Sequence, residues 1–180
     1  VNDVLALKQA KLSIAMESGA QATRSVADIV LLGDSFAALP EALLEGQRIM
    51  NSMSDVLRLY LTRSFALAFL IATVSMLAIG FPYTPAQNSV IAIFVLTVPA
   101  FAFALWAKPG PVPPGGTVRQ LVNFVLPASA VTGIFLFLVY LIFIETTGDW
   151  PYTQLALTYA TIATGLLLVV FVQPPTEFWV

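Results

Sequence analysis

The residues of this chain that are able to do chemistry are of few kinds. The 180-residue sequence contains no His and no Cys, which excludes imidazole bases, Ser–His triads, disulfides and thiolate or imidazole metal sites. Carboxylate, Lys, Arg and Tyr groups remain. The polar pair Asn2–Asp3, near the start of the stretch VNDVLALKQAKLSIAM, looks like part of an active site. The pair can also cap the helix that follows it, and without further context the capping role is favoured.

The composition of the chain predicts a membrane protein. Apolar residues make up 58% of the sequence and charged residues only 10%, against roughly 25% charged in typical soluble domains. A membrane-spanning helix needs about 20 mainly apolar residues. Uncharged stretches of sufficient length predict four spans, at about 64–80, 89–107, 121–144 and 154–172. The lipid bilayer is thus an expected partner, whereas the net charge of −2 gives no basis for binding nucleic acid.

The distribution of Lys and Arg predicts the orientation of these spans. Basic residues near the ends of a span favour the cytoplasmic side. They occur before the first span and between the second and third spans, at Arg48, Arg58, Arg63, Lys108 and Arg119. The segments 80–88 and 145–153 contain no basic residue. We therefore expect the N-terminal segment, the 108–119 loop and the C-terminal tail to face the cytoplasm.

The first 63 residues predict a different kind of structure. The stretch DVLALKQA suits a short helix, whereas KLSIAM and DIVLLG suit short strands, the second of them buried. Helices that alternate with strands indicate an α/β layer with parallel strands. Asp34 or Ser35 then caps a long amphipathic helix, which no breaker separates from the first span. The sequence thus predicts one continuous helix that joins a cytoplasmic domain to the bilayer.

These residues also carry a resemblance to a known family. The stretch VNDVLALKQAKLSIAM resembles the end of the hinge motif of P-type ATPases, written T-G-D-G-V-N-D, with the A-L-K-x-A and I-A-M signature behind it. Asp34-Ser35-Phe36 and the stretch EGQRIMN resemble the D-x-F and E-G-R-x-I-x-N motifs at the entry to the family's fifth membrane helix. The match is close over residues 1–63, and the later helices agree in number, order and orientation. The tail QPPTEFWV and residues 98–101 are similar to a bacterial subfamily near calcium-linked actinobacterial pumps.

The resemblance implies a fold and an activity. Residues 1–35 would be the end of an α/β HAD-like phosphorylation domain, residues 36–63 a stalk helix, and residues 64–180 a transmembrane domain of four α-helices. The full protein would be an ATP-driven cation pump of the bacterial plasma membrane that forms an aspartyl-phosphate, with Ca²⁺ as a candidate ion. The phosphorylated D-K-T-G-T motif and the nucleotide-binding domain are absent from this sequence. We therefore expect a fragment, inactive by itself, whose partners are the missing N-terminal domains of the same polypeptide. The alternative is a non-enzymatic four-helix membrane scaffold or assembly protein.

The resemblance also implies roles for the polar pair at the start. In the family's hinge motif the Asn contacts the phosphoryl group and the aspartates help to hold Mg²⁺, and Asn2 and Asp3 match these positions. Phosphoryl transfer depends mainly on positioning and charge neutralisation, which carboxylate-bound Mg²⁺ supplies. ATP would be the substrate of the full protein, and no ATP-binding residue is expected in this chain.

The predicted spans contain no Asp or Glu, so they offer only neutral groups to a transported ion. The candidates are the hydroxyls of Ser64 and Thr97 and the backbone carbonyl that Pro99 releases. The alternative for each hydroxyl is a bond back to its own helix or a role in helix packing. A divalent cation prefers six or more oxygens with net negative charge. Either the missing fourth helix of the family supplies that charge, or the ion is not bound as in calcium pumps.

Overall fold

The computed structural model describes residues 4–77, 80–110 and 117–172. The chain divides into two compact units, Val1–Gly46 and Gln47–Val180. The division falls within a single helix, α3 (Ala38–Met76). The domain boundaries expected after residues 35 and 63 stay predictions.

The first unit contains a pair of parallel strands. Its elements are α1 (Val4–Gln9), β1 (Ile14–Met16), α2 (Gln21–Arg24), β2 (Ile29–Leu31) and a 3₁₀ turn, η1 (Leu32–Asp34). Strand β1 pairs with β2 in parallel, with Ala15 opposite Val30. Because α2 lies between the two strands in sequence, this is the helical crossover that parallel pairing requires. The two strands predicted from KLSIAM and DIVLLG, and their parallel direction, are confirmed.

Two carboxylates fix the ends of this strand pair through backbone amides. The carboxylate of Asp28 accepts hydrogen bonds from the amide of Ser13 at 2.9 Å and from its hydroxyl at 2.8 Å. The carboxylate of Asp34 accepts a hydrogen bond from the amide of Ser18 at 2.9 Å. The amide donors stabilise the charged form, so the pKa of Asp28 lies below its usual value because of Ser13, and the pKa of Asp34 is lowered by Ser18.

The strand pair has little covering of its own. Ala15 and Leu31 are buried, but Ile29 and Val30 are 38% and 37% exposed. The expectation that DIVLLG forms a buried strand is therefore wrong for this chain. Two short strands cannot cover both of their faces, whereas parallel sheets normally have both faces covered. The described residues of this unit form a two-stranded sheet and no larger α/β domain.

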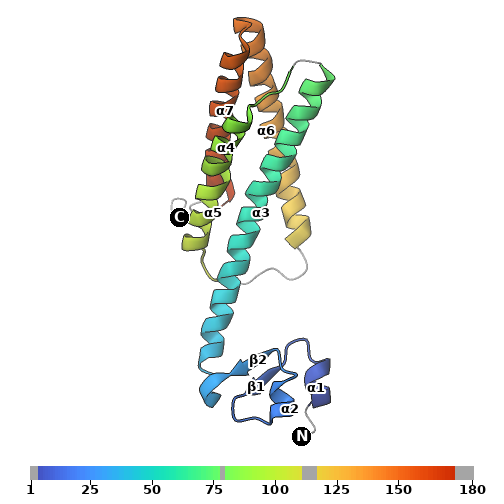
Figure 1. Cartoon of the computed structure of the whole chain (residues 1–180), viewed down its shortest axis with the longest axis vertical. Coiled ribbons are helices and arrows are strands. Elements are labelled where there is room, and N and C mark those ends of the chain that lie inside the picture. Colours follow the sequence, from blue (N-terminus) through green and yellow to red (C-terminus); the bar gives the residue numbers. More distant parts are fainter. Residues whose placement is uncertain (1–3, 78–79, 111–116, 173–180) are drawn as a thin grey trace. The chain divides into compact units, whose positions relative to one another are not determined.

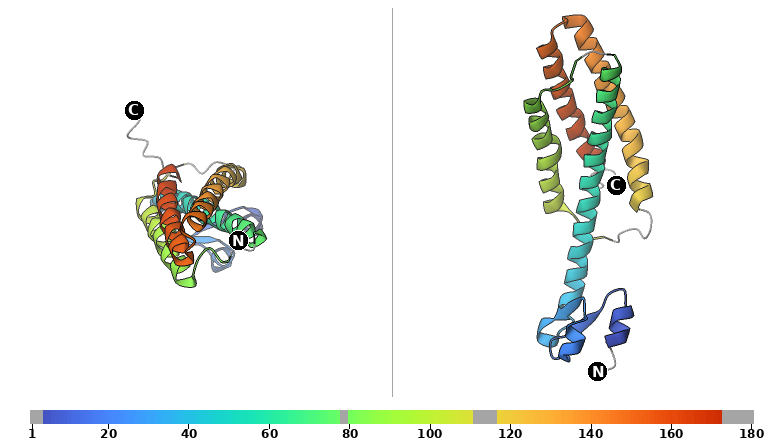
Figure 2. Two further views of the ribbon diagram at one scale, coloured as in Figure 1. Left: turned by 90° about the horizontal axis from the view of Figure 1, so that it is seen from above. Right: turned by 45° about the vertical axis from the view of Figure 1, so that its right-hand side comes forward.

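The second unit is a bundle of long helices, seen from three directions in Figures 1 and 2. After α3 come α4 (Pro85–Ala92), a π-helical turn η2 (Ile93–Thr97), α5 (Val98–Trp106), α6 (Thr117–Thr147) and α7 (Trp150–Val172). The segments α4, η2 and α5 follow one another without a break as Pro85–Trp106. Four of the described helices are long and apolar enough to cross a membrane: Ala38–Met76, Pro85–Trp106, Val118–Thr147 and Trp150–Val172. The predicted set of four long apolar helices is confirmed, and the chain is an integral membrane protein.

Glycines allow the helices of the bundle to approach one another closely. A Cβ atom at Gly165 of α7 would clash with a methyl carbon of Val95 in η2, and one at Gly133 of α6 would lie 2.8 Å from the ring of Phe69 in α3. Small residues serve this purpose in membrane helices, where close packing replaces the hydrophobic effect as the driving force. The largest buried cluster joins all four long helices and consists of Leu70, Val74, Tyr83, Ile91, Val95, Leu136, Tyr140 and Leu157.

The start of α4 is fixed by a capping box and by a contact with α7. The Thr84 hydroxyl accepts a hydrogen bond from the Gln87 amide at 3.2 Å, and the Gln87 side chain accepts one from the Thr84 amide at 2.9 Å. Pro85 occupies the first turn, where no amide hydrogen is needed. The side-chain amide of Gln154 in α7 donates to the carbonyl of Phe81 at 3.0 Å. These bonds position Tyr83 and Asn88 within the bundle.

Candidate functional site

The predicted catalytic pair lies outside the described part of the chain. Asn2 and Asp3 belong to residues 1–3, so their roles in phosphoryl transfer and Mg²⁺ binding stay predictions. Among the described residues, no group of three or more acidic side chains is close enough together to hold a metal ion.

The three predicted residues of the ion path lie in two different helices. Ser64 is half-buried in α3, whereas Thr97 is exposed at the end of η2 and Pro99 is buried in α5. The Thr97 hydroxyl reaches the carbonyl of Ala92 at 3.4 Å, so it bonds weakly within its own helix. The π-helical turn lies directly before Pro99, where the proline ring disturbs the regular hydrogen bonding. None of the three lines the cavity that lies within the bundle, and their role in transport stays a prediction.

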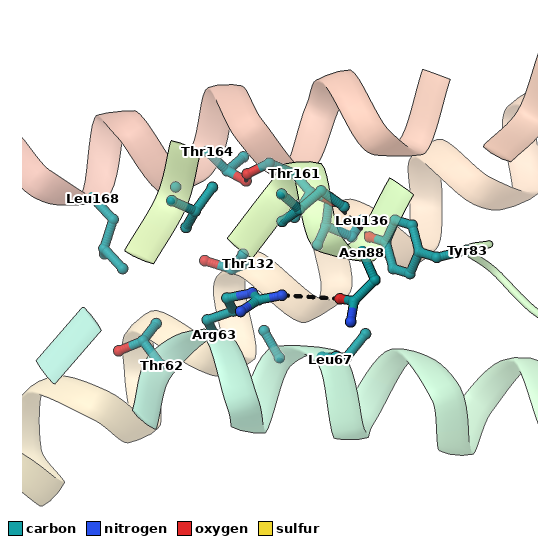
Figure 3. Close-up of a pocket in the computed structure, with 14 residues that line it drawn as sticks. Thr62, Arg63, Leu67, Tyr83, Asn88, Thr132, Leu136, Thr161, Thr164 and Leu168 are labelled. Carbon is teal, nitrogen blue, oxygen red and sulfur yellow. Dashed lines mark hydrogen bonds between the residues drawn. The ribbon is translucent and has the colours of Figure 1, made fainter. Parts of the chain in front are cut away.

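A small cavity of about 30 Å³ lies within the bundle, between α3, α4, η2, α6 and α7 (Figure 3). Apolar atoms form most of the surface of its wall, with Leu67, Ile91, Val95 and Leu136 among the residues that supply them. Its polar lining comes from all four long helices and from the segment before α4: Thr62, Arg63, Tyr83, Asn88, Thr132, Thr161 and Thr164. Polar groups from elements far apart in sequence thus converge on one point of an otherwise apolar bundle. Such convergence is the usual character of a binding site.

Arg63 is the charged residue of this cavity. Its side chain points from α3 toward Asn88, whose side-chain oxygen accepts a hydrogen bond from the guanidinium at 2.9 Å (Figure 3). Among the described residues, no carboxylate forms an ion pair with Arg63. The sequence contains no Asp or Glu between Asp55 and Glu145. The cavity therefore has a positive charge that the nearby described residues do not neutralise.

The hydroxyl groups around the cavity differ in how they are satisfied. The hydroxyls of Tyr83 and Thr161 lie 2.5 Å apart, and Thr161 also reaches the carbonyl of Leu157 at 2.7 Å. Thr164 bonds to the carbonyl of Ala160 at 2.8 Å. The hydroxyl of Thr62, by contrast, is buried without a hydrogen-bond partner among the described residues. A buried hydroxyl in this condition is costly and points to a group that is not part of the described chain.

A second polar cluster lies one and a half turns earlier on α3. The guanidinium of Arg58 pairs with the carboxylate of Asp55 at 3.3 Å and lies 5.8 Å from the ring centre of Phe124. Nearer the start of the unit, the side chains of Arg48 and Asn51 donate to the carbonyls of Leu105 at 2.6 Å and Lys108 at 3.2 Å. Side chains of the charged part of α3 are therefore hydrogen-bonded to the end of α5 and to the segment that follows it.

Sequence reasoning used Arg63 only as a marker of orientation and did not single out Asn88. The contact between them joins residues far apart in sequence, so no periodic pattern reveals it. One observation could have drawn attention to Arg63. It is the last charge before a long uncharged stretch, and no acidic residue follows until Glu145.

Comparison with known proteins connects this chain to cation-transporting ATPases. No protein-family model matches the chain. It is similar to "Calcium-transporting ATPase CtpE" of Mycobacterium tuberculosis, with 34% identity over an alignment of 193 residues that includes 99% of this chain and 24% of the relative. The protein of the same name in Mycolicibacterium smegmatis is 33% identical over the same shares of both chains. "Probable cation-transporting ATPase exp7" of Streptococcus pneumoniae is 38% identical over 109 residues, 56% of this chain and 14% of the relative.

The matches, the hinge and stalk motifs, and the four membrane-length helices define one class of protein. The chain corresponds to a segment of P-type ATPases and is similar, along almost its whole length, to the mycobacterial proteins named as calcium-transporting ATPases. It spans about a quarter of the length of these curated relatives.

Proposed function

We propose that this chain is a part of an ATP-driven cation pump, which couples the formation and hydrolysis of an aspartyl-phosphate to ion transport. The observation that carries this proposal is the similarity to calcium-transporting ATPases over 99% of the chain. Helix α3 supports it, because one helix of 39 residues contains both the charged stretch and the first apolar stretch. The non-enzymatic scaffold is not favoured, because the relatives that match over the whole chain are named as ATPases.

In this proposal the two units do different tasks. Residues 1–35 are the end of a HAD-like phosphorylation domain, residues 36–63 the stalk, and residues 64–180 the transport domain. Asn2 contacts the phosphoryl group and Asp3 contributes to Mg²⁺ binding, while ATP is bound by domains that this chain does not contain. The support for these two roles is their place in the hinge motif, together with the parallel strand pair that follows it. Mg²⁺, when bound, neutralises the charge of the phosphoryl group.

The proposed cargo is a cation, with Ca²⁺ as the first candidate because the whole-length relatives are named for calcium. The candidate path residues Ser64, Thr97 and Pro99 supply neutral oxygens only. Ca²⁺ needs carboxylates as well, so acidic groups from the rest of the pump complete the site. The location is the bacterial plasma membrane, with the N-terminal segment, the 108–119 loop and the C-terminal tail in the cytoplasm, as the positions of Lys and Arg favour.

The experiment that tests the proposed function uses the full-length protein that contains this segment. ATP hydrolysis is measured in purified protein with Ca²⁺, Mn²⁺, K⁺ or Na⁺ added to a constant concentration of Mg²⁺, and the acid-stable phosphoenzyme is measured in parallel. We expect one cation to stimulate hydrolysis and the Asp3→Asn variant to lose most of the phosphoenzyme. A protein that forms no phosphoenzyme with any of these cations would contradict the proposal.

The continuity of α3 gives the proposal a mechanical test. Ile49, Met50 and Met53 are exposed on α3, at 52%, 50% and 55%. Their replacement by three Gly weakens the helix by about 1 kcal/mol per residue relative to three Ala, with the same side-chain contacts removed in both variants. If α3 transmits the state of the phosphorylation domain to the membrane, the Gly variant should keep ATP hydrolysis but lose most of its transport. The Ala variant should retain both, and equal transport in the two variants would show that α3 does not act as a lever.

A further inference from the structure

The cavity places the charge of Arg63 level with the middle of the membrane helices, so this inference puts the start of the spanning part of α3 before residue 63, the predicted end of the stalk. The cavity that Arg63 lines also contacts Thr132, the middle residue of α6, and Thr161, the middle residue of α7. Both helices are long enough to span a bilayer, so lipid headgroups at their ends are far from this point. Charged side chains at this depth are costly, face a bundle interior or cavity, and are normally paired. Asn88 supplies a neutral oxygen and so does not balance the charge.

The acidic side chains of the described bundle are too far from Arg63 to pair with it. Asp55 lies eight residues earlier on the same helix, about 12 Å along its axis, and pairs with Arg58. Glu145 lies thirteen residues beyond Thr132, about 20 Å along α6, and Asp149 comes after the end of that helix.

The cavity has the size and the donors for one small anionic group. One water molecule needs about 10–15 Å³ of cavity volume, so a cavity of about 30 Å³ has room for roughly two groups of that size. The two oxygens of a carboxylate match that room. The guanidinium presents several N–H donors in a plane suited to a carboxylate. Thr62, whose hydroxyl is buried and has no hydrogen-bond partner among the described residues, lines the same cavity.

We propose that Arg63 and Thr62 bind a carboxylate at the middle of the membrane, supplied by an Asp or Glu side chain in a part of the pump beyond the described residues. This inference rests on the proposed function, because it requires the chain to be packed with other segments of a longer protein. The guanidinium donates to the carboxylate oxygens, and the Thr62 hydroxyl donates a further hydrogen bond. The carboxylate is thereby kept ionised in an apolar surrounding that favours its neutral form.

The test uses N,N′-dicyclohexylcarbodiimide, which reacts with protonated carboxylic acids in apolar surroundings, on the full-length protein in detergent. Labelled positions are identified by mass spectrometry in wild type and in Arg63→Gln, Arg63→Lys and Asn88→Asp. We expect one intramembrane Asp or Glu to react several-fold more in Arg63→Gln, where it loses its cation and becomes protonated. Arg63→Lys keeps the charge and should resemble wild type. Asn88→Asp places a rival carboxylate beside Arg63 and should expose the same partner to labelling.

The hydroxyl of Thr62 is tested by a matched pair of variants. Thr62→Val removes the donor at constant shape and should increase labelling of the same residue, whereas Thr62→Ser should not. If labelling at every acidic residue is independent of Arg63, the proposal is wrong. If activity instead requires chloride in wild type and not in Arg63→Gln, the site binds a free anion, and the proposal is also wrong.

The outcome is separable from that of the proposed function. Labelling does not depend on ATP hydrolysis. A protein that shows the expected labelling but forms no phosphoenzyme would therefore support the carboxylate site and contradict the proposed pump function. A cation-stimulated ATPase whose labelling is the same in wild type and in Arg63→Gln would support the pump function and contradict the carboxylate site. Asn88→Asp keeps the size of the side chain, so it provides a result even if Arg63→Gln does not fold.

Discussion

Arg58 and Arg63 are the same kind of residue on the same helix, yet their surroundings are opposite. Five residues separate them, which turns their side chains roughly 140° apart around α3. Arg58 pairs with the buried carboxylate of Asp55 and lies over the ring of Phe124. Arg63 faces a cavity and has the neutral side chain of Asn88 as its hydrogen-bond acceptor. The charge of Arg58 is neutralised within the described residues, whereas Arg63 has no carboxylate partner among them.

The largest effect is expected where the neutralised pair is broken. Asp55→Asn should leave Arg58 without its carboxylate in a mostly buried position and lower the free energy of unfolding by about 2 kcal/mol, less than for a fully buried pair because Arg58 is partly exposed. The measurement is the melting temperature of the 180-residue chain in detergent. Asp149→Asn, at an exposed acid, is the control. Equal shifts of the melting temperature in Asp55→Asn and Asp149→Asn would show that the pair of Asp55 with Arg58 does not stabilise the chain.

A carboxylate placed beside Arg63 should have the opposite effect. Asn88→Asp replaces a neutral acceptor, 2.9 Å from the guanidinium, with a charged one, and should stabilise the 180-residue chain by about 1 kcal/mol. The gain should vanish in an Arg63→Gln background, which a double-mutant cycle measures. If the proposed carboxylate already pairs with Arg63 in the full-length protein, the gain should be smaller there. A gain that is independent of Arg63 would show that the pairing is not its cause.

The remaining hydrogen bonds of the cavity should contribute less than the charges. Tyr83→Phe removes the bond between the hydroxyls of Tyr83 and Thr161, and should lower stability by about 0.5 kcal/mol, because Thr161 keeps its bond to the carbonyl of Leu157. Tyr152→Phe, at a residue that is 65% exposed, is the matched control and should change nothing. Thermal unfolding of both variants checks the prediction. A larger loss of stability for Tyr83→Phe than for Asp55→Asn would show that this hydrogen bond contributes more than the ion pair.

The smallest effect concerns a carboxylate that is stabilised by hydrogen bonds instead of a cation. The amide of Ser13 holds the pKa of Asp28 below its ordinary value. A depressed pKa means that this carboxylate stabilises the strand pair above the pKa of the unfolded chain, near 3.9, and that the contribution is lost as the pH falls through the folded-state pKa. Amide hydrogen exchange in β1, corrected for intrinsic rates, should therefore accelerate below about pH 4. Asp28→Asn should abolish this extra pH dependence, and an unchanged profile in that variant would contradict the explanation.

The elements of this fold were predictable because each leaves a local pattern in the sequence. Uncharged stretches of membrane length predicted four long helices, and alternation of short helical and apolar stretches predicted two parallel strands. The exposure of Ile29 and Val30 was not predicted, since an apolar strand reads as buried whether or not the chain supplies its cover. The bounds of α4 were also missed, because Thr84 and Gln87 form a capping box within a stretch that looked like a loop.

The cavity was not predictable in the same way. It depends on the meeting of Arg63 with Asn88, and of Tyr83 with Thr161, across turns and helices whose packing has no signature in the sequence. Ser64, Thr97 and Pro99 were chosen because each is locally unusual within an apolar span. A polar residue or a proline within an apolar span does not reveal which face of the helix packs against its neighbours. Thr97, for example, is exposed.

We propose that this chain is part of a pump that uses ATP to move a cation, and transport by the full-length protein tests that proposal. The protein is reconstituted into lipid vesicles, and uptake of ⁴⁵Ca²⁺ is followed after addition of ATP and Mg²⁺, with Mn²⁺, K⁺ and Na⁺ examined in the same way. The account predicts ATP-dependent accumulation of one cation, Ca²⁺ first, and its loss in the Asp3→Asn variant. Vesicles that accumulate none of these cations in response to ATP, while the protein is folded and inserted, would contradict it.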